Sequence, residues 1–263
     1  MTHLHKAIGV IFLISLILSS TAEQQRKLII VGEDWPPFEF YSNNKVVGIN
    51  SSIIKEICTK HKIPYEIIFV PYIRAIHMLK TGKADVALST SRNAKREKFL
   101  KFPEDDDAVL WTSRYTFFYN KFDGIKDIKS YQEIKDKNYT IAIVRAYSYH
   151  PDFWKYFPKN IDSQPNPNLI VVSYMDQCLK MLRSNRVDLV LTEKTVGNYM
   201  ASLFNLNGLK ASKKNMFEKK YYLPFSKKST LKNIDKIQEI FQKELKLMKA
   251  DGRYDEIYKQ WVE

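Results

Sequence analysis

Two twelve-residue stretches share one pattern: MLKTGKADVALS at residues 78–89 and MLRSNRVDLVLT at residues 181–192. Both read Met-Leu, a cation, a hydroxyl residue, Gly or Asn, and a second cation, followed by an apolar run that contains one Asp and closes on Ser or Thr. Their separation of roughly a hundred residues is far longer than the period of a stacked repeat. The pattern therefore predicts two lobes of similar plan.

Each copy predicts the end of a helix and a turn. The helices are expected to end at Leu79 and Leu182. The turns then fall at Gly82 and Asn185, which are residue types that tolerate the left-handed conformation of a helix C-cap.

A short apolar strand is predicted after each turn, at residues 84–88 and 187–191. Such runs are typical of buried parallel strands. Ligands of open α/β sheets bind beyond the carboxyl ends of the strands. Ser89 and Thr192, which end the two copies, are therefore expected to open onto one cleft shared by the lobes.

The N-terminal 22 residues are interpreted as a secretory signal peptide. Lys6 precedes an uncharged run at residues 7–18, which is short for a membrane span. Small residues then surround the cleavage position after about Ala22. An N-terminal membrane anchor is the alternative. We expect an exported, soluble mature protein.

The charge of the chain is strongly positive, with 42 Lys and Arg against 29 Asp and Glu. Such a balance can indicate nucleic-acid binding. Here the lysines are spread over every helical segment, and no basic arm occurs. A solvated lysine-rich surface is therefore favoured, with attraction of anionic ligands as the alternative, and no nucleic-acid partner is expected.

Apolar strand-like segments alternate with helical ones, which predicts βα units and mostly parallel sheets, an α/β fold class. Two crossings, near residues 111–118 and 220–225, are expected to form a hinge. The C-terminal stretch is predicted to be helical, with an interruption near Asp251-Gly252. The predicted organisation is a signal peptide at 1–22, lobe 1 at 23–115 and 222–263, and lobe 2 at 116–221.

Aromatic residues stand at two predicted element ends. In GEDWPPFEF, residues 32–40, two prolines stop the strand and stiffen the turn, which favours Trp35 as an aromatic wall of the cleft and Phe38 as a core residue. Tyr72 follows Pro71 at a helix start and offers either a second aromatic face or half-buried packing. The two acids before Trp35 either contact a ligand or cap the turn.

Arg96 is a candidate for binding a carboxylate. Asn93 is a typical N-cap residue, so Arg96 lies in the first helical turn, facing back over the strand that ends near Ser89 and Ser91. A guanidinium matches a carboxylate bidentately, and such a pair contributes roughly 1.5–3 kcal/mol. A solvated Arg96 is the alternative reading, with Arg92 and Lys95 as other candidate cations.

Glu193 occupies the mirrored position after the second repeat. An acid and an arginine on facing lobes would complement the ammonium and carboxylate of a zwitterion; alternatively, Glu193 is the N-cap of the next helix. Extra cations, Arg74 or Arg145, would favour a polar or acidic ligand side chain. If the ligand is instead basic, Glu33 or Asp34 becomes the expected contact.

No catalytic, metal or cofactor motif is present in the sequence. The histidines after the signal peptide, His61, His77 and His150, have no metal spacing, and no glycine-rich phosphate loop occurs. Cys58 and Cys178 each fall within a helical pattern and are expected to be free, buried thiols. We expect a binding protein that has no cofactor and is not an enzyme.

Taken in order, these motifs resemble the bacterial periplasmic solute-binding proteins of the polar amino-acid class, extracellular solute-binding protein family 3. The resemblance implies the two-lobed periplasmic-binding-protein fold, with two hinge crossings and closure over one small molecule. It also implies an amino-acid-like ligand, an inner-membrane ABC permease as partner, a monomer, and a periplasmic location. The motifs that carry it are WPPFEF, PYIRAIHMLKTGKADV, RNAKREKFLKF, RAYSY, NRVDLVLTE and DGRYDEIYKQW.

Residue roles follow from the resemblance. Arg96 matches the arginine that binds the ligand α-carboxylate, and Glu193 matches the acid that takes the α-ammonium. Trp35 and Tyr72 match the aromatic positions that sandwich the ligand side chain. Ser89, Ser91, Tyr147 and Ser148 match polar contacts in the two lobes.

The chain departs from the family pattern at several positions, which leaves the identity of the ligand open. Asn93 replaces a usual Thr, Gly32 an acid, Ala146 a glycine, and Asn50 stands at an Asp-containing helix start. Two alternatives stay open. One is a periplasmic dehydratase of aromatic-precursor acids, with Glu193 as a general acid if burial raises its pKa; the other is a sensory module for a partner receptor.

Overall fold

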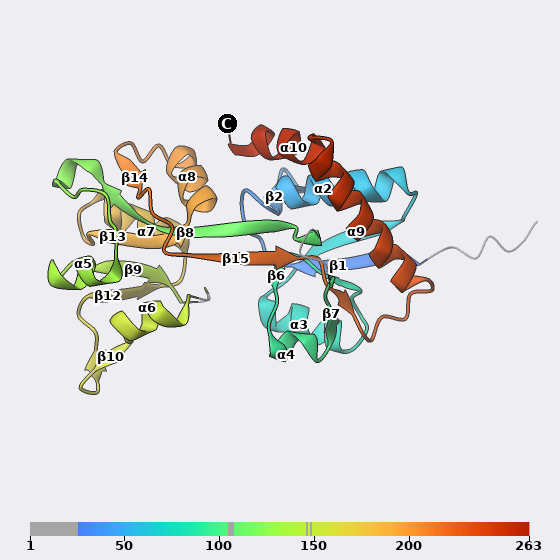
Figure 1. Ribbon diagram of the computed structural model, residues 1–263, viewed down its shortest axis with the longest axis horizontal. Helices are drawn as coiled ribbons and strands as arrows, with labels where there is room; N and C mark the ends of the chain where they lie inside the picture. The colour runs from blue at the N-terminus through green and yellow to red at the C-terminus, as the bar shows by residue number, and fades with distance from the viewer. Residues whose placement is uncertain (1–25, 105–107, 146, 148, 263) are drawn as a thin grey trace, which may run out of the picture.

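The computed structural model describes residues 26–104, 108–145, 147 and 149–262. The predicted signal peptide, Ala146 and Ser148 lie outside the described residues. Two sheets, each flanked by helices, form two lobes (Figure 1). This arrangement confirms the predicted two-lobed α/β fold class.

The sheet of the first lobe is built from both ends of the chain. Its N-terminal strands pair in parallel, β1 with β4 and with β5, whereas β16, from the C-terminal part, pairs antiparallel with β5 and β7. The strands in order are β4 (Tyr65–Phe69), β1 (Leu28–Gly32), β5 (Val86–Ala87), β16 (Phe225–Ser226) and β7 (Leu100–Lys101). The helices are α2 (Ile49–Lys60), α3 (Tyr72–Lys80), α4 (Ala94–Glu97), α9 (Ile234–Ala250) and α10 (Arg253–Val262), with a hairpin of β2 (Phe40–Ser42) and β3 (Lys45–Val47).

The sheet of the second lobe has a parallel half and an antiparallel half. Its order is β12 (Leu169–Val172), β9 (Ile141–Val144), β13 (Leu189–Glu193), β8 (Trp111–Asn120), β15 (Phe217–Tyr222) and β6 (Thr90–Ser91), with β14 (Leu209–Ala211) beside β8. The remaining elements are η2 (Lys121–Asp123), α5 (Tyr131–Asp136), α6 (Pro151–Tyr156), α7 (Met175–Arg183), α8 (Lys194–Leu203) and the hairpin of β10 (Asn160–Ile161) and β11 (Gln164–Pro165).

The strands β8 and β15 connect the two lobes. They pair antiparallel, from Phe217 opposite Tyr115 to Tyr221 opposite Trp111. Figure 1 shows them running across the middle of the molecule, with α8 and α10 on one side and α3, α4 and α6 on the other. Residues on alternate positions of these hinge strands therefore face opposite sides of the molecule.

The turns of the repeat are confirmed. Gly82 and Asn185 both have positive φ, 72° and 56°, directly after α3 and α7. A Cβ on Gly82 would lie 2.2 Å from the carbonyl oxygen of Lys228, so the first copy needs glycine for space as well as for conformation. Asn185 tolerates the same conformation through its short polar side chain.

The strands of the repeat differ from the prediction. In the first copy only Val86–Ala87 forms a strand, and in the second the strand starts two residues later and reaches Glu193. Thr192 is thus inside β13. Its side chain is fully buried and packs toward Gly197 of α8, where an added Cβ would lie 2.9 Å from the Thr192 methyl. The expectation that Thr192 opens onto the cleft is wrong, because strand alternation turns it to the helix side.

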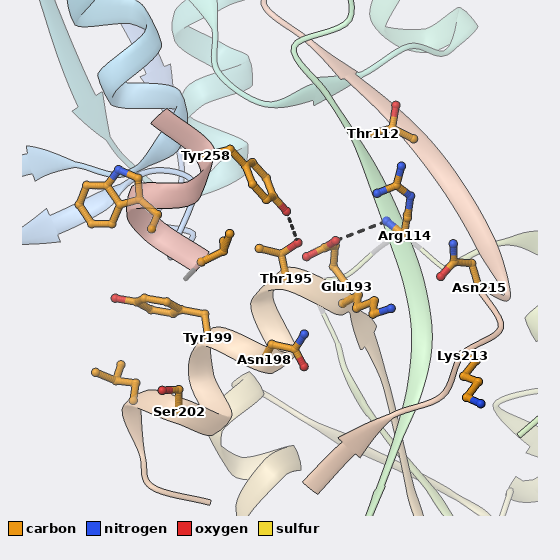
Figure 2. A pocket seen from close by; sticks show the side chains of 14 residues that line it. Thr112, Arg114, Glu193, Thr195, Asn198, Tyr199, Ser202, Lys213, Asn215 and Tyr258 are labelled. Carbon is orange, nitrogen blue, oxygen red and sulfur yellow. Dashed lines mark hydrogen bonds between the residues drawn. The ribbon is translucent and has the colours of Figure 1, made fainter. Parts of the chain in front are cut away.

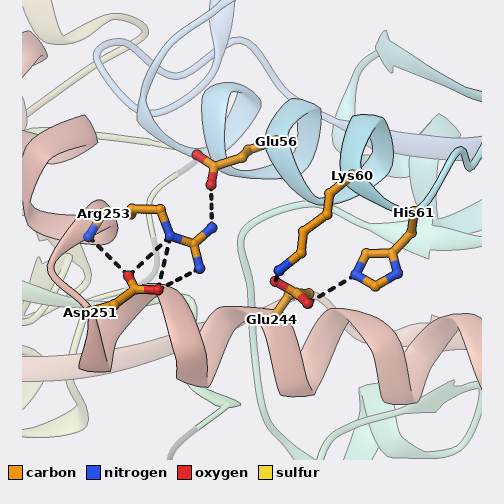
Figure 3. Close-up of polar contacts among 6 residues, drawn as sticks. All are labelled: Glu56, Lys60, His61, Glu244, Asp251 and Arg253. Atoms are coloured by element: carbon orange, nitrogen blue, oxygen red, sulfur yellow. Dashed lines mark hydrogen bonds and ion pairs between the residues drawn. The ribbon is translucent and has the colours of Figure 1, made fainter.

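The C-terminal helices are fastened to the first lobe by polar contacts (Figure 3). Glu244 of α9 accepts hydrogen bonds from Lys60 at 2.8 Å and pairs with His61 at 2.9 Å. Arg253 at the start of α10 contacts Asp251 and Glu56 of α2. The predicted interruption at Asp251-Gly252 is confirmed, and it lets the chain turn between α9 and α10.

Cys58 and Cys178 are free and buried, as expected. Both belong to one apolar core that includes residues of both lobes, such as Ile53, Phe118 and Leu245. A second apolar cluster fills the second lobe, and a third packs α3 against the sheet of the first. Within the described residues, no helix is long and apolar enough to cross a membrane.

Candidate functional site

Arg96 is held in a defined position at the start of α4. The Asn93 side chain accepts a hydrogen bond from the Arg96 backbone nitrogen at 3.0 Å, which makes Asn93 the N-cap, as predicted. The guanidinium Nη1 donates to the backbone oxygen of Ser91 at 2.7 Å and to its hydroxyl at 2.6 Å. Ser91 therefore fixes the orientation of the guanidinium.

Tyr72 lies against the other edge of the same guanidinium. Its hydroxyl accepts hydrogen bonds from Nε at 3.2 Å and from Nη2 at 2.9 Å. The guanidinium carbon lies 5.6 Å from the centre of the Tyr72 ring. Glu33 accepts a hydrogen bond from the backbone nitrogen of Tyr72 at 3.1 Å and so caps α3. The structure thus brings together three of the candidate site residues, Arg96, Ser91 and Tyr72.

Trp35 and Tyr147 bring the two lobes into contact. Their ring centres are 6.2 Å apart, and Trp35 also packs edge-on against Trp111 at 5.3 Å and against Tyr221 at 5.5 Å. Trp111 and Tyr221 are stacked with centres 4.6 Å apart. Burial raises the pKa of Tyr221 to about 12, so its phenol is protonated at neutral pH. The cluster forms an aromatic floor between the lobes.

Ser89 belongs to a buried polar network in the first lobe. Its φ of 45° is in the left-handed region. Asn50 donates to the Ser89 hydroxyl at 2.8 Å and to the Glu39 carboxylate at 2.6 Å. Burial, opposed by hydrogen bonds from Ser89 and Asn50, raises the pKa of Glu39 to about 8. The Ser89 hydroxyl therefore contacts Asn50 of α2 and stabilises the turn in which Ser89 lies.

Glu193 is the N-cap of α8, which is one of the two roles considered for it. Its carboxylate accepts a hydrogen bond from the backbone nitrogen of Val196 at 2.8 Å and a longer one from the backbone nitrogen of Arg114 at 3.4 Å. Its exposed fraction is only 2%. Burial raises the pKa of Glu193 to about 7, against the effect of these hydrogen bonds. Arg96 and Glu193 both act electrostatically on Tyr221.

The other charged candidates lie at the surface. Arg74 and Arg145 are exposed. Asp34 is exposed and accepts a hydrogen bond from the backbone nitrogen of Tyr41 at 3.4 Å. The placement of Asp34 agrees with its turn-capping role, and the exposure of Arg74 means that its side chain is solvated.

Lys219 carries no signal in the sequence, but the structure places it near Arg96. It projects from β15 on the same side as Phe217 and Tyr221. Burial and then the charge of Arg96 lower the pKa of Lys219 to about 8. Only the pairing of β15 with β8 and β6 reveals this position, and that pairing joins segments far apart in the sequence.

A cavity of about 610 Å³ lies on the opposite side of the hinge strands (Figure 2). We call it the hinge cavity. It lies between α8 and α10, and the hydroxyls of Thr195 and Tyr258 are 2.7 Å apart at its wall. Glu193, Thr112 and Arg114 also line it. The hydrogen bond between Thr195 and Tyr258 joins the second lobe to the C-terminal helix of the first.

No group of three or more His, Cys, Asp or Glu side chains positioned to hold a metal ion occurs in the part of the chain that the structure describes. The polar groups around Arg96 suit an organic ligand. They offer an oriented cation, hydroxyls and aromatic faces.

Comparisons with known proteins agree with this picture. The family model described as bacterial extracellular solute-binding proteins, family 3, matches residues 28–263. The arginine-binding extracellular protein ArtP of Bacillus subtilis is 24% identical over 92% of this chain and 89% of its own length.

Solved structures share the fold. The arginine-, lysine-, histidine-binding protein ArtJ of Geobacillus stearothermophilus has a TM-score of 0.66 at 19% identity, over 90% of this chain and 95% of that one. A histidine kinase sensor domain with similarity to periplasmic binding proteins has a TM-score of 0.70 at 17% identity, over 91% of this chain and 97% of that one.

Proposed function

Because the chain belongs to the bacterial extracellular solute-binding proteins, family 3, we propose that it captures a small zwitterionic ligand, an amino acid or a derivative, between its lobes. The α-carboxylate binds Arg96, and the rest of the ligand lies over the aromatic floor. The observation that carries this proposal is the guanidinium of Arg96, which Ser91 orients beside the Tyr72 ring and beside aromatic rings from both lobes.

Binding and closure are linked in this proposal. A ligand that contacts both lobes binds the closed arrangement more tightly than the open one, and this difference in affinity favours closure. Burial of most of a small ligand is compatible with micromolar or tighter binding, about −8 kcal/mol. Trp35, Tyr72, Ser91, Arg96 and Tyr147 are the proposed contacts; Ser89 acts through the turn it holds.

The cellular role that we propose is delivery of the ligand to an inner-membrane ABC permease. The chain would act in the periplasm as a monomer, after removal of the signal peptide following about Ala22. The ArtP relative is named for arginine binding, which supports an amino-acid-like ligand at the level of the class.

The ligand assignment is tested by mass spectrometry of the small molecules that co-purify with the protein. A thermal-shift screen over the twenty amino acids complements it. We expect an amino acid or close derivative to co-purify with the protein and to raise its Tm. In Arg96→Ala, both the co-purification and the shift in Tm should be lost. A co-purified ligand without a carboxylate, or one retained equally by Arg96→Ala, would contradict it.

A dehydratase activity is the second candidate, because one observation favours it. Glu193 has the raised pKa, about 7, that a general acid needs at neutral pH. Against it, the carboxylate is occupied as the cap of α8. Incubation with prephenate or arogenate, followed by detection of the aromatic product, separates the dehydratase from the binding protein. Formation of product by the wild type but not by Glu193→Gln would establish the enzyme. Unchanged substrate supports the binding protein.

A further inference from the structure

Lys219 lies on the side of the hinge that carries the proposed ligand site. On β15, Phe217, Lys219 and Tyr221 alternate with Glu218 and Lys220. Tyr221 faces the aromatic floor, where it stacks on Trp111. Lys220 faces the other side, where it lines a second cavity with residues of α9 and α10. Strand alternation therefore assigns Lys219 to the Arg96 side.

Strand pairing brings Lys219 close to Arg96. Ser91, which accepts two hydrogen bonds from Arg96, pairs with Tyr221 across β6 and β15. Lys219 is two residues from Tyr221 along β15. The charge of Arg96 is also felt at Lys219, where it adds to burial in lowering the pKa of the ammonium to about 8. Strand pairing and electrostatics both indicate that the Lys219 side chain lies near Arg96.

We propose that Lys219 is a second anion-binding residue beside Arg96, and that the ligand carries a second acidic group, as in an acidic amino acid. This inference rests on the proposed function and narrows it. Arg96 binds the α-carboxylate, and Lys219 meets the side-chain carboxylate. A hydrogen bond to a charged group is stronger than one between neutral groups, so the acid is preferred over its amide.

The same placement disfavours basic ligands. The side chain of an arginine or lysine ligand would bring a further positive charge toward Arg96 and Lys219, and like charges that lie close together repel. The chain is thereby distinguished from the relatives whose names state arginine binding.

The test is calorimetry with L-glutamate, L-aspartate, L-glutamine, L-asparagine and L-arginine. We expect the wild-type protein to bind one of the acids at least tenfold more tightly than its amide and than arginine. Lys219→Met should lose tenfold or more in affinity for that acid, with less than threefold change for the amide. Lys220→Met, the neighbour on the opposite face, is the matched control and should change neither.

Lys219→Gln provides a second variant, and thermal unfolding of both variants verifies that they fold. Wild-type preference for arginine or for an amide, or an equal loss of acid and amide binding in both Lys219 variants, would overturn the role of Lys219. If arginine or an amide binds and its binding is lost in Arg96→Ala, the proposed function is still supported and only the role of Lys219 is wrong. Binding of none of the probes, and of no co-purifying amino acid, would overturn both.

Discussion

The hydroxyl of Tyr72 accepts hydrogen bonds from both Nε and Nη2 of Arg96, at 3.2 and 2.9 Å. The edge formed by Nε and Nη2 is one of the edges through which a guanidinium binds a carboxylate bidentately. Nη1 is held separately by Ser91. The Tyr72 hydroxyl thus occupies an edge that a ligand carboxylate would use.

Removal of the Tyr72 hydroxyl should therefore not weaken binding. In Tyr72→Phe the ring remains, and Ser91 still orients the guanidinium through two hydrogen bonds. The carboxylate no longer displaces a hydroxyl worth about 1 kcal/mol. We expect calorimetry to show unchanged or up to about fivefold tighter binding.

Tyr72→Ala is the companion variant, since it also removes the ring and should weaken binding. If Tyr72→Phe alone loses more than tenfold in affinity, the hydroxyl contacts the ligand directly and the displacement account is wrong.

The hydrogen bond between Thr195 and Tyr258 should oppose closure. It joins the lobes on the side of the hinge strands away from Arg96. We expect a rotation that brings the lobes together on the Arg96 side to separate α8 from α10 and to break this bond. Tyr258→Phe should lower the free energy of closure by about 0.5–1.5 kcal/mol and tighten ligand binding about 2- to 10-fold.

A double-mutant cycle with Thr195→Val provides the control. Both single variants and the double variant should show the same gain in affinity, because each removes the same bond. Looser binding in Tyr258→Phe would show that this contact is kept or strengthened on closure.

Glu39 should make the stability depend on pH. Its pKa in the folded protein, about 8, is above the ordinary value of 4.5. Between these values the unfolded chain releases the proton and the folded chain retains it. The free energy of unfolding therefore falls as the pH rises from about 4.5 to about 8, by up to about 1.4 kcal/mol per pH unit, and the loss is complete above that range.

Urea unfolding of Glu39→Gln and wild type at pH 5 and pH 8 measures this effect. The variant cannot ionise, so its stability relative to wild type should increase toward pH 8. Titration of Glu193 occurs in both proteins and cancels in the difference. Glu66→Gln, at an exposed carboxylate of β4, is the control. If the free energies of unfolding of wild type and Glu39→Gln differ by the same amount at pH 5 and pH 8, Glu39 is already ionised in the folded protein and the prediction is wrong.

Local chemistry explains which parts of the site were predictable. The N-cap at Asn93 and the helix start after Pro71 depend on neighbours in the chain, and they place Arg96 and Tyr72 where the sequence predicts. The turns at Gly82 and Asn185 are local in the same way.

Non-local pairing explains the rest. Thr192 faces α8 because β13 runs two residues further than its apolar pattern indicates. Lys219 comes near Arg96 only through the pairing of β15 with β6. Glu39 becomes a buried partner of Asn50 only when the GEDWPPFEF turn folds against α2. None of these contacts leaves a periodic or motif signal in the sequence.

Calorimetry of Arg96→Ala tests the central claim most directly, with the amino acid that gives the largest thermal shift as ligand. Loss of a bidentate charged contact should cost about 2–4 kcal/mol, or roughly 30- to 1000-fold in affinity. Arg96→Lys should recover only part of it, because an ammonium lacks the planar fork. Arg92→Ala, whose guanidinium pairs with Glu97 at 2.7 Å, should bind within about threefold of wild type. Wild-type affinity in Arg96→Ala would contradict the carboxylate assignment and direct attention to Arg92 or Arg145.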